Sequence, residues 1–466
     1  MLITLLFLLA VLLFVYAVLL KIGKQVAMCF VSVVSLSLLF WADGWLMLIL
    51  PALALLTWGI TKLMSREKGL LWQRIWLIVG ILVQLAPLLL FKYGHAWMRL
   101  GPQMFSSDFI LNSVFMPLGI SFYVFRGVSY CVDVYEKRCP NDVTFLEYLA
   151  FITFFPFLVA GPVVRAVDFI PQMRSRKQID GTLLYSGLFL LLSGIIKKAI
   201  ADHIGVFNNW VFDTPEAYSG IELSAAVLGF SMQVYADFSA YSDISIGVAA
   251  MLGFRIRDNF SFPYRATNVT SFWHRWHISL STWFRDYVYI PLGGNRHGKA
   301  RMASALLVTM LLAGIWHGTG WLFAAWGLWH GLGLVFHKVL QPWLRKIPDI
   351  WCVKAVSWAV TFVFLCLGWL IFRAGSVDDL CYIAQHLFDG YEPQAILAFL
   401  QARLSWCILV MAVLLSQILQ RRHVYMLQAR FVWSSWLTKL VIILIVLQIL
   451  IQLNQINIEP FIYNQF

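Results

Sequence analysis

Runs of apolar residues alternate with short polar loops along the whole chain. A helix rises 1.5 Å per residue, so about 20 apolar residues cross the roughly 30 Å hydrocarbon core of a bilayer. The pattern predicts an all-α polytopic membrane protein of about 11–13 membrane helices, some of them short or re-entrant. No hydrophilic block is long enough for a separate globular domain, so residues 1–466 are predicted to form a single membrane domain. The predicted spans are 2–20, 26–41, 45–61, 75–91, 113–132, 144–160, 183–200, 222–252, 302–316, 321–340, 355–373, 404–420 and 436–453.

The distribution of Lys and Arg between the loops predicts the orientation of the spans. Loops 21–25 and 62–74 carry basic residues, whereas the turn at 42–44 carries none. Cytoplasmic loops of membrane proteins are enriched in Lys and Arg. Both basic loops are therefore predicted to be cytoplasmic, which leaves the N-terminus outside. The same rule makes 421–430 cytoplasmic and the acidic stretch 374–402 external, which leaves the C-terminus outside.

One segment conflicts with a simple alternation of sides. Loops 133–143 and 161–182 are both basic, yet only the run 144–160 separates them. The simplest solution is a re-entrant or surface segment at 144–160, which Pro156 and the Gly161-Pro162 pair favour. Non-helical backbone at membrane depth is tolerated only where it is buried in protein or lines a cavity. A central cavity is therefore expected.

Composition agrees with a membrane protein and narrows the function classes. Only 12% of the residues are charged, against about 25% in soluble domains. The net charge of +12 is accounted for by basic loops between spans, so no nucleic-acid partner is expected. The seven cysteines are scattered and form no C-x-x-C, which argues against a disulfide framework or a cysteine-based zinc site.

Two carboxylates, Asp237 and Asp243, lie inside the apolar run 222–252. A carboxylate at mid-bilayer costs about 2.5–3.5 kcal/mol on insertion scales, so it persists only when it is paired or faces water. One interpretation is a proton relay or a cavity wall. The other, which we favour, is a structural ion pair with one of the arginines that follow.

The densest basic stretch, 255–301, is predicted to be cytoplasmic and rich in tryptophan. Thr270 or Ser271 is a candidate N-cap for a helix that would place Trp273, Trp276, Leu280 and Trp283 on one stripe. This helix is either an interfacial anchor or the wall of a basic vestibule for a phosphate-bearing ligand, and the two are compatible. The candidate ligand-binding residues of this stretch are Trp273, His274, Arg275, Trp276, Arg285, Asp286, Asn295 and Arg296.

The run from Gly293 to Lys299 matches G-x-x-x-x-G-K, but Ala300 stands where a phosphate-binding loop needs Ser or Thr. No strand pattern precedes it, so ATP hydrolysis is excluded and the segment 291–295 is predicted to be a turn.

Three histidines are candidates for chemistry. His274 and His277 form H-x-x-H on a predicted helix, and with His317 they could bind a metal. No carboxylate or cysteine completes such a set, so no metal is expected. The arm 302–316 before His317 has 15 residues, about 22 Å of helix. His317 is therefore predicted to lie deep in the membrane, either as a general base or as a structural histidine.

Six motifs in order along the chain resemble the membrane-bound O-acyltransferase family. They are F-W-H-R-W-H-I-S-L-S-T-W-F-R-D-Y-V-Y-I-P-L-G-G-N-R at 272–296, A-G-I-W-H-G at 313–318, D-F-S-A-Y-S-D-I-S-I-G at 237–247, P-L-G-I-S-F-Y at 117–123, A-G-P-V-V-R at 160–165 and the terminal P-F-I-Y-N-Q-F. The core motifs occupy about residues 113–331, and the first forty residues match less well. The sequence is most similar to the bacterial branch of alginate O-acetylation membrane proteins and their D-alanyl-transferring relatives.

The resemblance implies a ring of tilted helices around a thinned centre, with a tunnel through the membrane. It assigns the catalytic histidine to His317 and the second polar motif residue to His277, with His274 in a supporting role. His277, or an indole N–H of Trp273 or Trp276, would orient the base or stabilise the oxyanion.

The resemblance further implies an acetyltransferase of the bacterial inner membrane. The expected donor is cytoplasmic acetyl-CoA, with no permanently bound cofactor. The expected partners are the lipid bilayer and a periplasmic esterase-like acetyltransferase that passes the acetyl group to a polysaccharide. An alginate-like exopolysaccharide is the first candidate and peptidoglycan the next.

Two other functions remain open. A transporter or channel for an anionic solute would move its cargo past Asp237, Asp243 and the arginines without acyl transfer. A eukaryote-like lipid or protein acyltransferase is the other alternative, although the terminal motif and P-L-G-G-N-R favour the bacterial branch.

Overall fold

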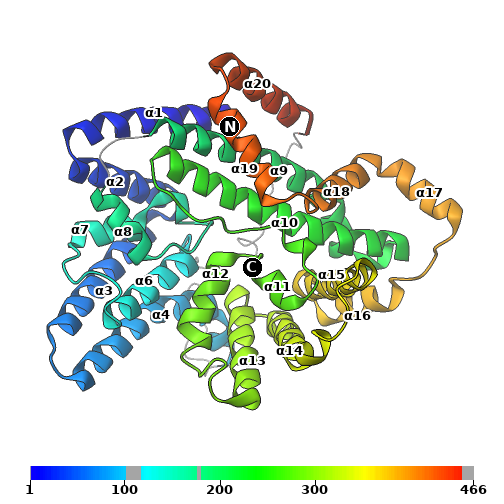
Figure 1. Ribbon diagram of the computed structural model, residues 1–466, viewed down its shortest axis with the longest axis horizontal. Helices are drawn as coiled ribbons and strands as arrows, with labels where there is room; N and C mark the ends of the chain where they lie inside the picture. Colours follow the sequence, from blue (N-terminus) through cyan, green and yellow to red (C-terminus); the bar gives the residue numbers. More distant parts are fainter. Residues whose placement is uncertain (1, 101–116, 176–179, 454–466) are drawn as a thin grey trace. The chain divides into compact units, whose positions relative to one another are not determined.

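The described part of the chain is all helical. The computed structural model describes residues 2–100, 117–175 and 180–453. The start of the predicted span 113–132 and the terminal P-F-I-Y-N-Q-F lie outside the described residues. Within these ranges there is no strand, which confirms the predicted fold class (Figure 1). Six described helices are long and apolar enough to cross a membrane, and a seventh crossing is reached if α17 and α18, bent by 88°, count as one span.

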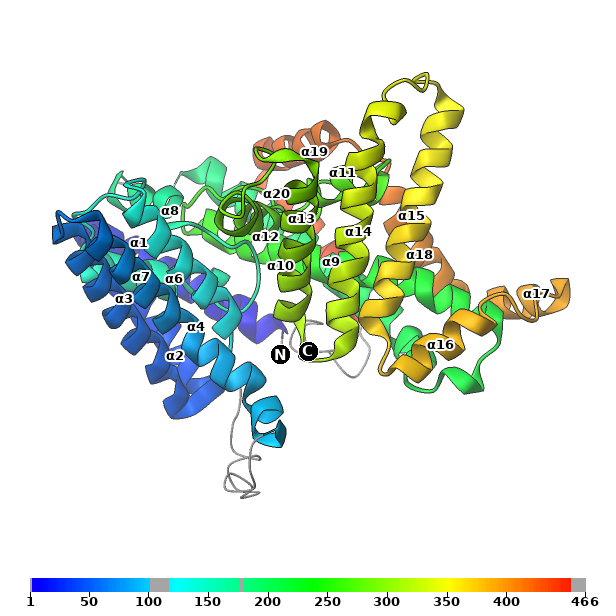
Figure 2. The ribbon, with the colours of Figure 1, turned by 90° about the horizontal axis from the view of Figure 1, so that it is seen from below.

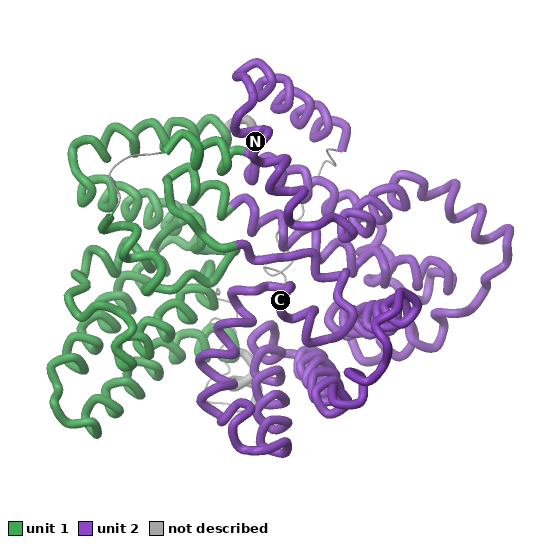
Figure 3. The backbone as a smooth tube through the Cα atoms, viewed as in Figure 1, with its two compact units in different colours: residues 1–188, 245–257 green, residues 189–244, 258–466 purple. Residues whose placement is uncertain are grey.

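The chain divides into two compact units, residues 1–188 with 245–257 and residues 189–244 with 258–466 (Figure 3). The first unit packs long apolar helices side by side and adds two short ones after them. These helices are α1 (Leu2–Ile22), α2 (Lys24–Asp43), α3 (Ile49–Arg66), α4 (Leu70–Leu100), α6 (Ile120–Tyr135), α7 (Phe145–Thr153) and α8 (Ala166–Ser175).

The predicted re-entrant segment is a short helix followed by a break. Thr144 caps α7 through Glu147, and α7 ends after nine residues, before the Phe155–Phe157 turn. Arg174, in the last turn of α8, binds Asp142 at 3.0 Å and Glu147 at 2.7 Å. This contact holds the pKa of the Glu147 carboxyl below its usual range. Since both basic loops meet at Arg174, the two ends of the segment between them lie close together in this unit.

The first two basic loops also contact this region. Lys24 donates a hydrogen bond of 2.6 Å to the Arg174 carbonyl, and Lys62 donates one to the Asn141 carbonyl. Four loops that the sequence predicted to be cytoplasmic thus lie against one another within the first unit. These contacts agree with the prediction that 144–160 does not cross, and its topology stays a prediction.

The second unit carries the remaining helices, and α13, α14 and α15 run beside one another in it (Figure 2). Helices α8, α16, α17 and α19 had not been predicted from the apolar runs. The helices of this part are α9 (Gly181–Asp213) and α10 (Gly220–Met251), each shared between the two units, then α11 (Val269–Trp273), α12 (Ile278–Phe284), α13 (Gly298–His317), α14 (Trp321–Leu344), α15 (Trp351–Arg373), α16 (Val377–His386), α17 (Pro393–Ala402), α18 (Leu404–Ser416), α19 (Arg421–Trp433) and α20 (Trp436–Leu453).

Helices α13 and α14 approach closely because glycines face one another across the pair. A Cβ at Gly314 would lie 2.2 Å from the Phe323 carbonyl oxygen, and one at Gly327 would lie 2.4 Å from the Met310 carbonyl oxygen. Small residues allow such backbone contact in membrane helix pairs. The contact fixes the position of the C-terminal end of α13, where His317 stands.

The carboxylates of α10 are paired with lysines of α9. Lys198 lies 2.8 Å from Asp237, which is 2% exposed, and Lys197 lies 2.6 Å from Asp243. The expectation that an arginine after α10 would be the partner is wrong. The lysines come 39 and 46 residues before their partners in the sequence and lie on the neighbouring helix, so no pattern along α10 itself could indicate them.

Candidate active site

The predicted tryptophan-rich helix is broken into two short helices. Asn268, not Thr270 or Ser271, caps α11 by accepting a 2.8 Å hydrogen bond from the Ser271 N–H. Helix α11 ends at Trp273, and α12 begins only after His277, whose φ of 40° is left-handed. The predicted continuous stripe and the H-x-x-H pair on one helical face are therefore wrong.

The side chain and backbone of Asn259 explain the break. The Asn259 carbonyl accepts the Ile278 N–H at 2.8 Å, and its Oδ1 accepts the Ser279 N–H at 3.1 Å and the Ser279 hydroxyl at 2.8 Å. The first N–H groups of a helix otherwise lack partners. Because Asn259 accepts hydrogen bonds from the N–H groups of Ile278 and Ser279, a new helix, α12, begins at Ile278.

His277 belongs to this network and is 1% exposed. Its Nδ1 lies 3.2 Å from Asn259 Oδ1, an oxygen that already accepts the Ser279 N–H, so Nδ1 donates and Nε2 carries the lone pair of the neutral ring. The ring packs edge-on against Phe238 at 4.5 Å. His277 is thus held by polar contacts behind the first turn of α12.

A cavity of about 360 Å³, which we call the His317 cavity, runs between α11, α12, α13 and α14. On α14 its wall extends from Lys338 to Trp326, about 18 Å by helical rise. His274, Arg285, Tyr289, Asn295 and Lys338 give it polar and cationic groups. Its other wall residues are Thr270, Trp273, Ile278, Leu280, Ser281, Thr282, Phe284, Leu306, Thr309, Met310, Ala313, His317, Trp326 and Leu334.

His317 is the last residue of α13 and is 5% exposed. Its ring meets Trp326 edge-to-face at 5.0 Å and Phe372 at 5.4 Å. Helix α13 has 20 residues and not the 15 that the sequence argument used. At about 30 Å it is long enough to cross the hydrocarbon core. The 15-residue arm, on which the prediction of depth rested, is therefore wrong, and His317 lies at the opposite end of α13 from Lys299 and Arg301.

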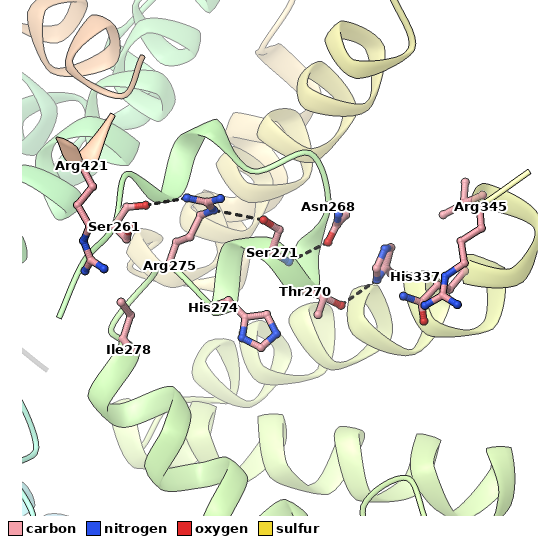
Figure 4. A pocket seen from close by; sticks show the side chains of 12 residues that line it. Ser261, Asn268, Thr270, Ser271, His274, Arg275, Ile278, His337, Arg345 and Arg421 are labelled. Atoms are coloured by element: carbon pink, nitrogen blue, oxygen red, sulfur yellow. Dashed lines mark hydrogen bonds between the residues drawn. The ribbon is translucent and has the colours of Figure 1, made fainter. Parts of the chain in front are cut away.

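Figure 4 shows a second cavity of about 570 Å³, which we call the arginine cavity. It adjoins the first, because the two share lining residues. Arg275, Arg345 and Arg421 line it, and no carboxylate is among its lining residues within the described ranges. Arg275 is held by the Ser261 carbonyl at 3.2 Å and the Ser271 hydroxyl at 3.3 Å. The remaining lining residues are Asn268, Thr270, His274, Ile278, His337, Gln341 and Leu344.

His274 lies where the two cavities meet, since it lines both together with Thr270 and Ile278. Burial lowers the pKa of the His274 ring, and Lys338, Arg285 and Arg275 lower it further. The imidazole is therefore neutral near pH 7, and the positive charge at this junction comes from arginine and lysine.

The structure brings together some of the predicted site residues and separates others. Asp286 supports the site indirectly, because it binds the Arg285 guanidinium at 2.7 Å. Trp276 is 1% exposed and packs against Trp369 at 4.8 Å. The residues that line a cavity are Trp273, His274, Arg275, Arg285, Asn295 and His317, whereas His277, Trp276, Asp286 and Arg296 line neither.

Sequence reasoning missed the contribution of α14. Trp326 and Lys338 line the His317 cavity, and His330 lies between them along the helix, 0% exposed. Both ring nitrogens of His330 lack a hydrogen-bond partner among the described residues. A buried polar group left in this state costs about 1–3 kcal/mol. The signal was present in the sequence, since Trp329-His330-Gly331 repeats the tripeptide that ends at Gly318.

The site therefore combines a buried histidine, a cavity that leads to it and a cationic second cavity, on an all-α membrane chain. The family model described as MBOAT, membrane-bound O-acyltransferase family, matches residues 33–375, and the chain belongs to this family. The resemblance expected from the motifs is confirmed. The protein is a multi-pass membrane O-acyltransferase.

Curated relatives narrow the branch of the family. The chain is 36% identical over 415 residues to the "Probable alginate O-acetylase AlgI" of Pseudomonas putida, and the matched region covers 84% of each protein. It is 32% identical over 335 residues to the "Peptidoglycan O-acetyltransferase" of Helicobacter pylori, covering 66% of this chain and 63% of that protein. It is 28% identical over 270 residues to the "Teichoic acid D-alanyltransferase" of Bacillus subtilis, covering 55% of this chain and 68% of that protein. For several other alginate O-acetylases the match spans about 60% of the relative's length.

Proposed function

We propose that this chain moves an acetyl group from cytoplasmic acetyl-CoA across the bacterial inner membrane for O-acetylation of a cell-envelope or extracellular polysaccharide. The observation that carries the proposal is the position of His317 in the wall of an elongated cavity with cationic groups. The similarity to alginate and peptidoglycan O-acetyltransferases supports the acetyl group and the polysaccharide.

The two adjoining cavities suit the two parts of the donor. Coenzyme A carries phosphates on a nucleotide and a long arm that ends in the thioester. Arginine guanidinium groups match phosphate oxygens with paired hydrogen bonds, so the arginine cavity suits the nucleotide end. The His317 cavity, about 18 Å long on α14, suits the arm.

In the proposed reaction His317 acts as general base. It removes the proton from an acceptor hydroxyl, whose oxygen attacks the thioester carbonyl carbon. The carbon–sulfur bond then breaks, and the imidazolium returns the proton to the departing thiolate. Trp273 lines the cavity, and its indole N–H, buried without a partner among the described residues, could donate to the oxyanion. Trp276 lines neither cavity, so it is the less suitable of the two indoles.

His277 supports this reaction indirectly in our proposal. Its Nδ1–H bonds to Asn259, the residue that also starts α12. Five cavity residues, Ile278, Leu280, Ser281, Thr282 and Phe284, belong to that helix. His277 would therefore fix the wall of the cavity.

The wider setting is also part of the proposal. Both chain termini lie outside, as the basic loops predict, and His317 stands at the far end of α13 from the basic side. A periplasmic esterase-like acetyltransferase would take the acetyl group there and pass it to the polymer. An alginate-like exopolysaccharide is the first candidate and peptidoglycan the second, in line with the names of the relatives.

The test is the O-acetyl content of the envelope polysaccharide in cells that carry a His317→Ala chain. Because the general base is lost, acetylation should fall by about 100-fold or more while the protein remains abundant in the membrane. The matched control is His203→Ala on α9, which contacts Ser405 and should leave acetylation unchanged. Normal acetylation by the His317→Ala chain would disprove the proposed mechanism.

A further inference from the structure

His330 of α14 is a polar residue in an aromatic enclosure. Its ring lies 4.8 Å from that of Trp326, four residues earlier on the same helix face, and 5.3 Å from that of Trp273 on α11. Phe364 of α15 closes a third side at 5.6 Å, with its ring perpendicular to the imidazole. A Cβ at Gly368 would lie only 2.8 Å from His330 Nε2, so this glycine makes room for the nitrogen.

Packing alone does not account for a histidine at this position. The side chain is 0% exposed, and both of its nitrogens lack hydrogen-bond partners among the described residues. A phenylalanine of similar shape would fill the same space without burying polar atoms. The nitrogens therefore have a use that the aromatic contacts do not provide.

The groups around His330 indicate what that use is. Trp273 and Trp326 both line the His317 cavity, and the indole N–H of each is buried without a partner in the described chain. A neutral imidazole offers one acceptor nitrogen. Two unused indole donors and one unused imidazole acceptor thus share one buried cluster.

We propose that His330 is a positioning residue for acyl transfer, which sets the orientation of the two cavity-wall indoles and, through Trp326, that of His317. Trp326 is the link because it meets both imidazoles edge-to-face, at 4.8 Å and 5.0 Å. In a close-packed interior a ring fixed on one side restricts its neighbour on the other. The expected effect of His330 on turnover rests on the proposed function, whereas its expected effect on the orientation of the His317 ring does not.

The experiment compares His330→Phe with the wild-type chain, both full length in lipid nanodiscs. Turnover is measured with acetyl-CoA, and the reaction of His317 with diethyl pyrocarbonate is followed by peptide mass spectrometry over a pH series. His330→Phe should lower kcat by about 10–100-fold with an unchanged KM for acetyl-CoA, because a small misplacement of the base is costly. It should also change the modification rate of His317 by about threefold or more, without lowering the melting temperature.

Two further variants separate positioning from packing. Phe364→Leu removes a ring that contacts His330 but leaves the nitrogens in place, so it should lower the melting temperature and leave kcat within about twofold. The amide variants His330→Asn and His330→Gln keep a hydrogen-bonding group near Nδ1 and Nε2 respectively. At least one of them should recover activity relative to His330→Phe.

Equal kcat and equal His317 modification in His330→Phe and wild type would overturn the inference. So would a loss of kcat in Phe364→Leu as large as that in His330→Phe, because packing would then explain both. If the wild-type chain transfers nothing from acetyl-CoA, the proposed function fails, and the modification rate of His317 still decides whether His330 positions it.

Discussion

At the residue scale, His317 and its neighbours form a buried aromatic site in the wall of an elongated cavity. The ring of His317 is 5% exposed and is bordered by Trp326 and Phe372. Burial among apolar rings strengthens an electrostatic contact with a developing charge. The site therefore suits proton removal from a hydroxyl and stabilisation of an oxyanion.

His277 provides a prediction at this scale, because its backbone is left-handed and its side chain is hydrogen-bonded. Asparagine tolerates this conformation and keeps a hydrogen-bonding group, whereas alanine loses both. His277→Ala should reduce turnover about tenfold or more, and His277→Asn should retain a larger part of it. The measurement is O-acetylation normalised to the amount of chain in the membrane. Equal activity of His277→Ala and wild type would leave His277 as a packing residue only.

The sequence identified individual functional candidates better than it identified the residues that contact them in the fold. The tripeptide with His317 stands out in an apolar run, and the structure places the buried His317 side chain in the cavity wall. His330 carries the same tripeptide, yet its contacts come from α11 and α15, which are distant in sequence. Which polar residues meet depends on tertiary packing, and no local pattern encodes that packing.

At the element scale, the site depends on the close pairing of α13 and α14. Gly327→Ala should push the helices apart, because the new Cβ would lie 2.4 Å from the Met310 carbonyl oxygen. The expected loss of stability is about 1–3 kcal/mol. It would be measured as a lower melting temperature in detergent, with reduced turnover. The control is Gly59→Ala on α3, where a Cβ has nothing within 4 Å and no loss is expected. An unaffected Gly327→Ala chain would show that the close pairing is dispensable.

Apolar runs predicted the long helices well because lipid imposes length and apolarity on any spanning segment. They failed at α11 and α12, where tryptophan spacing suggested one helix. Asn259 lies far enough away in the chain that its bonds to Ile278 and Ser279 could not be foreseen. The short helices α8 and α16 are polar or amphipathic and carry no run of spanning length.

At the scale of the whole molecule, the basic loops and the re-entrant segment define a topology that can be tested. In a cysteine-free chain, Asn141→Cys and Ser175→Cys should both react with an impermeant maleimide from the cytoplasmic side only. The physical reason is that Arg174 binds Asp142 directly, so the loops on both sides of α7 lie together. Trp45→Cys, in the turn before α3, is the control and should react from the opposite side. Reaction of positions 141 and 175 from opposite sides would mean that 144–160 crosses the membrane.

The central claim is that the chain, with His317 as general base, transfers an acetyl group from acetyl-CoA across the membrane, and a transfer assay in vesicles tests it most directly. Acetyl-CoA labelled in its acetyl group is supplied to inside-out membrane vesicles, and free thiol and lumenal label are both followed. The wild-type chain should release thiol as labelled acetyl appears in the lumen, and His317→Ala should do neither at equal abundance. Thiol release by His317→Ala at the wild-type rate, or lumenal acetyl-CoA with its thioester intact, would contradict the account.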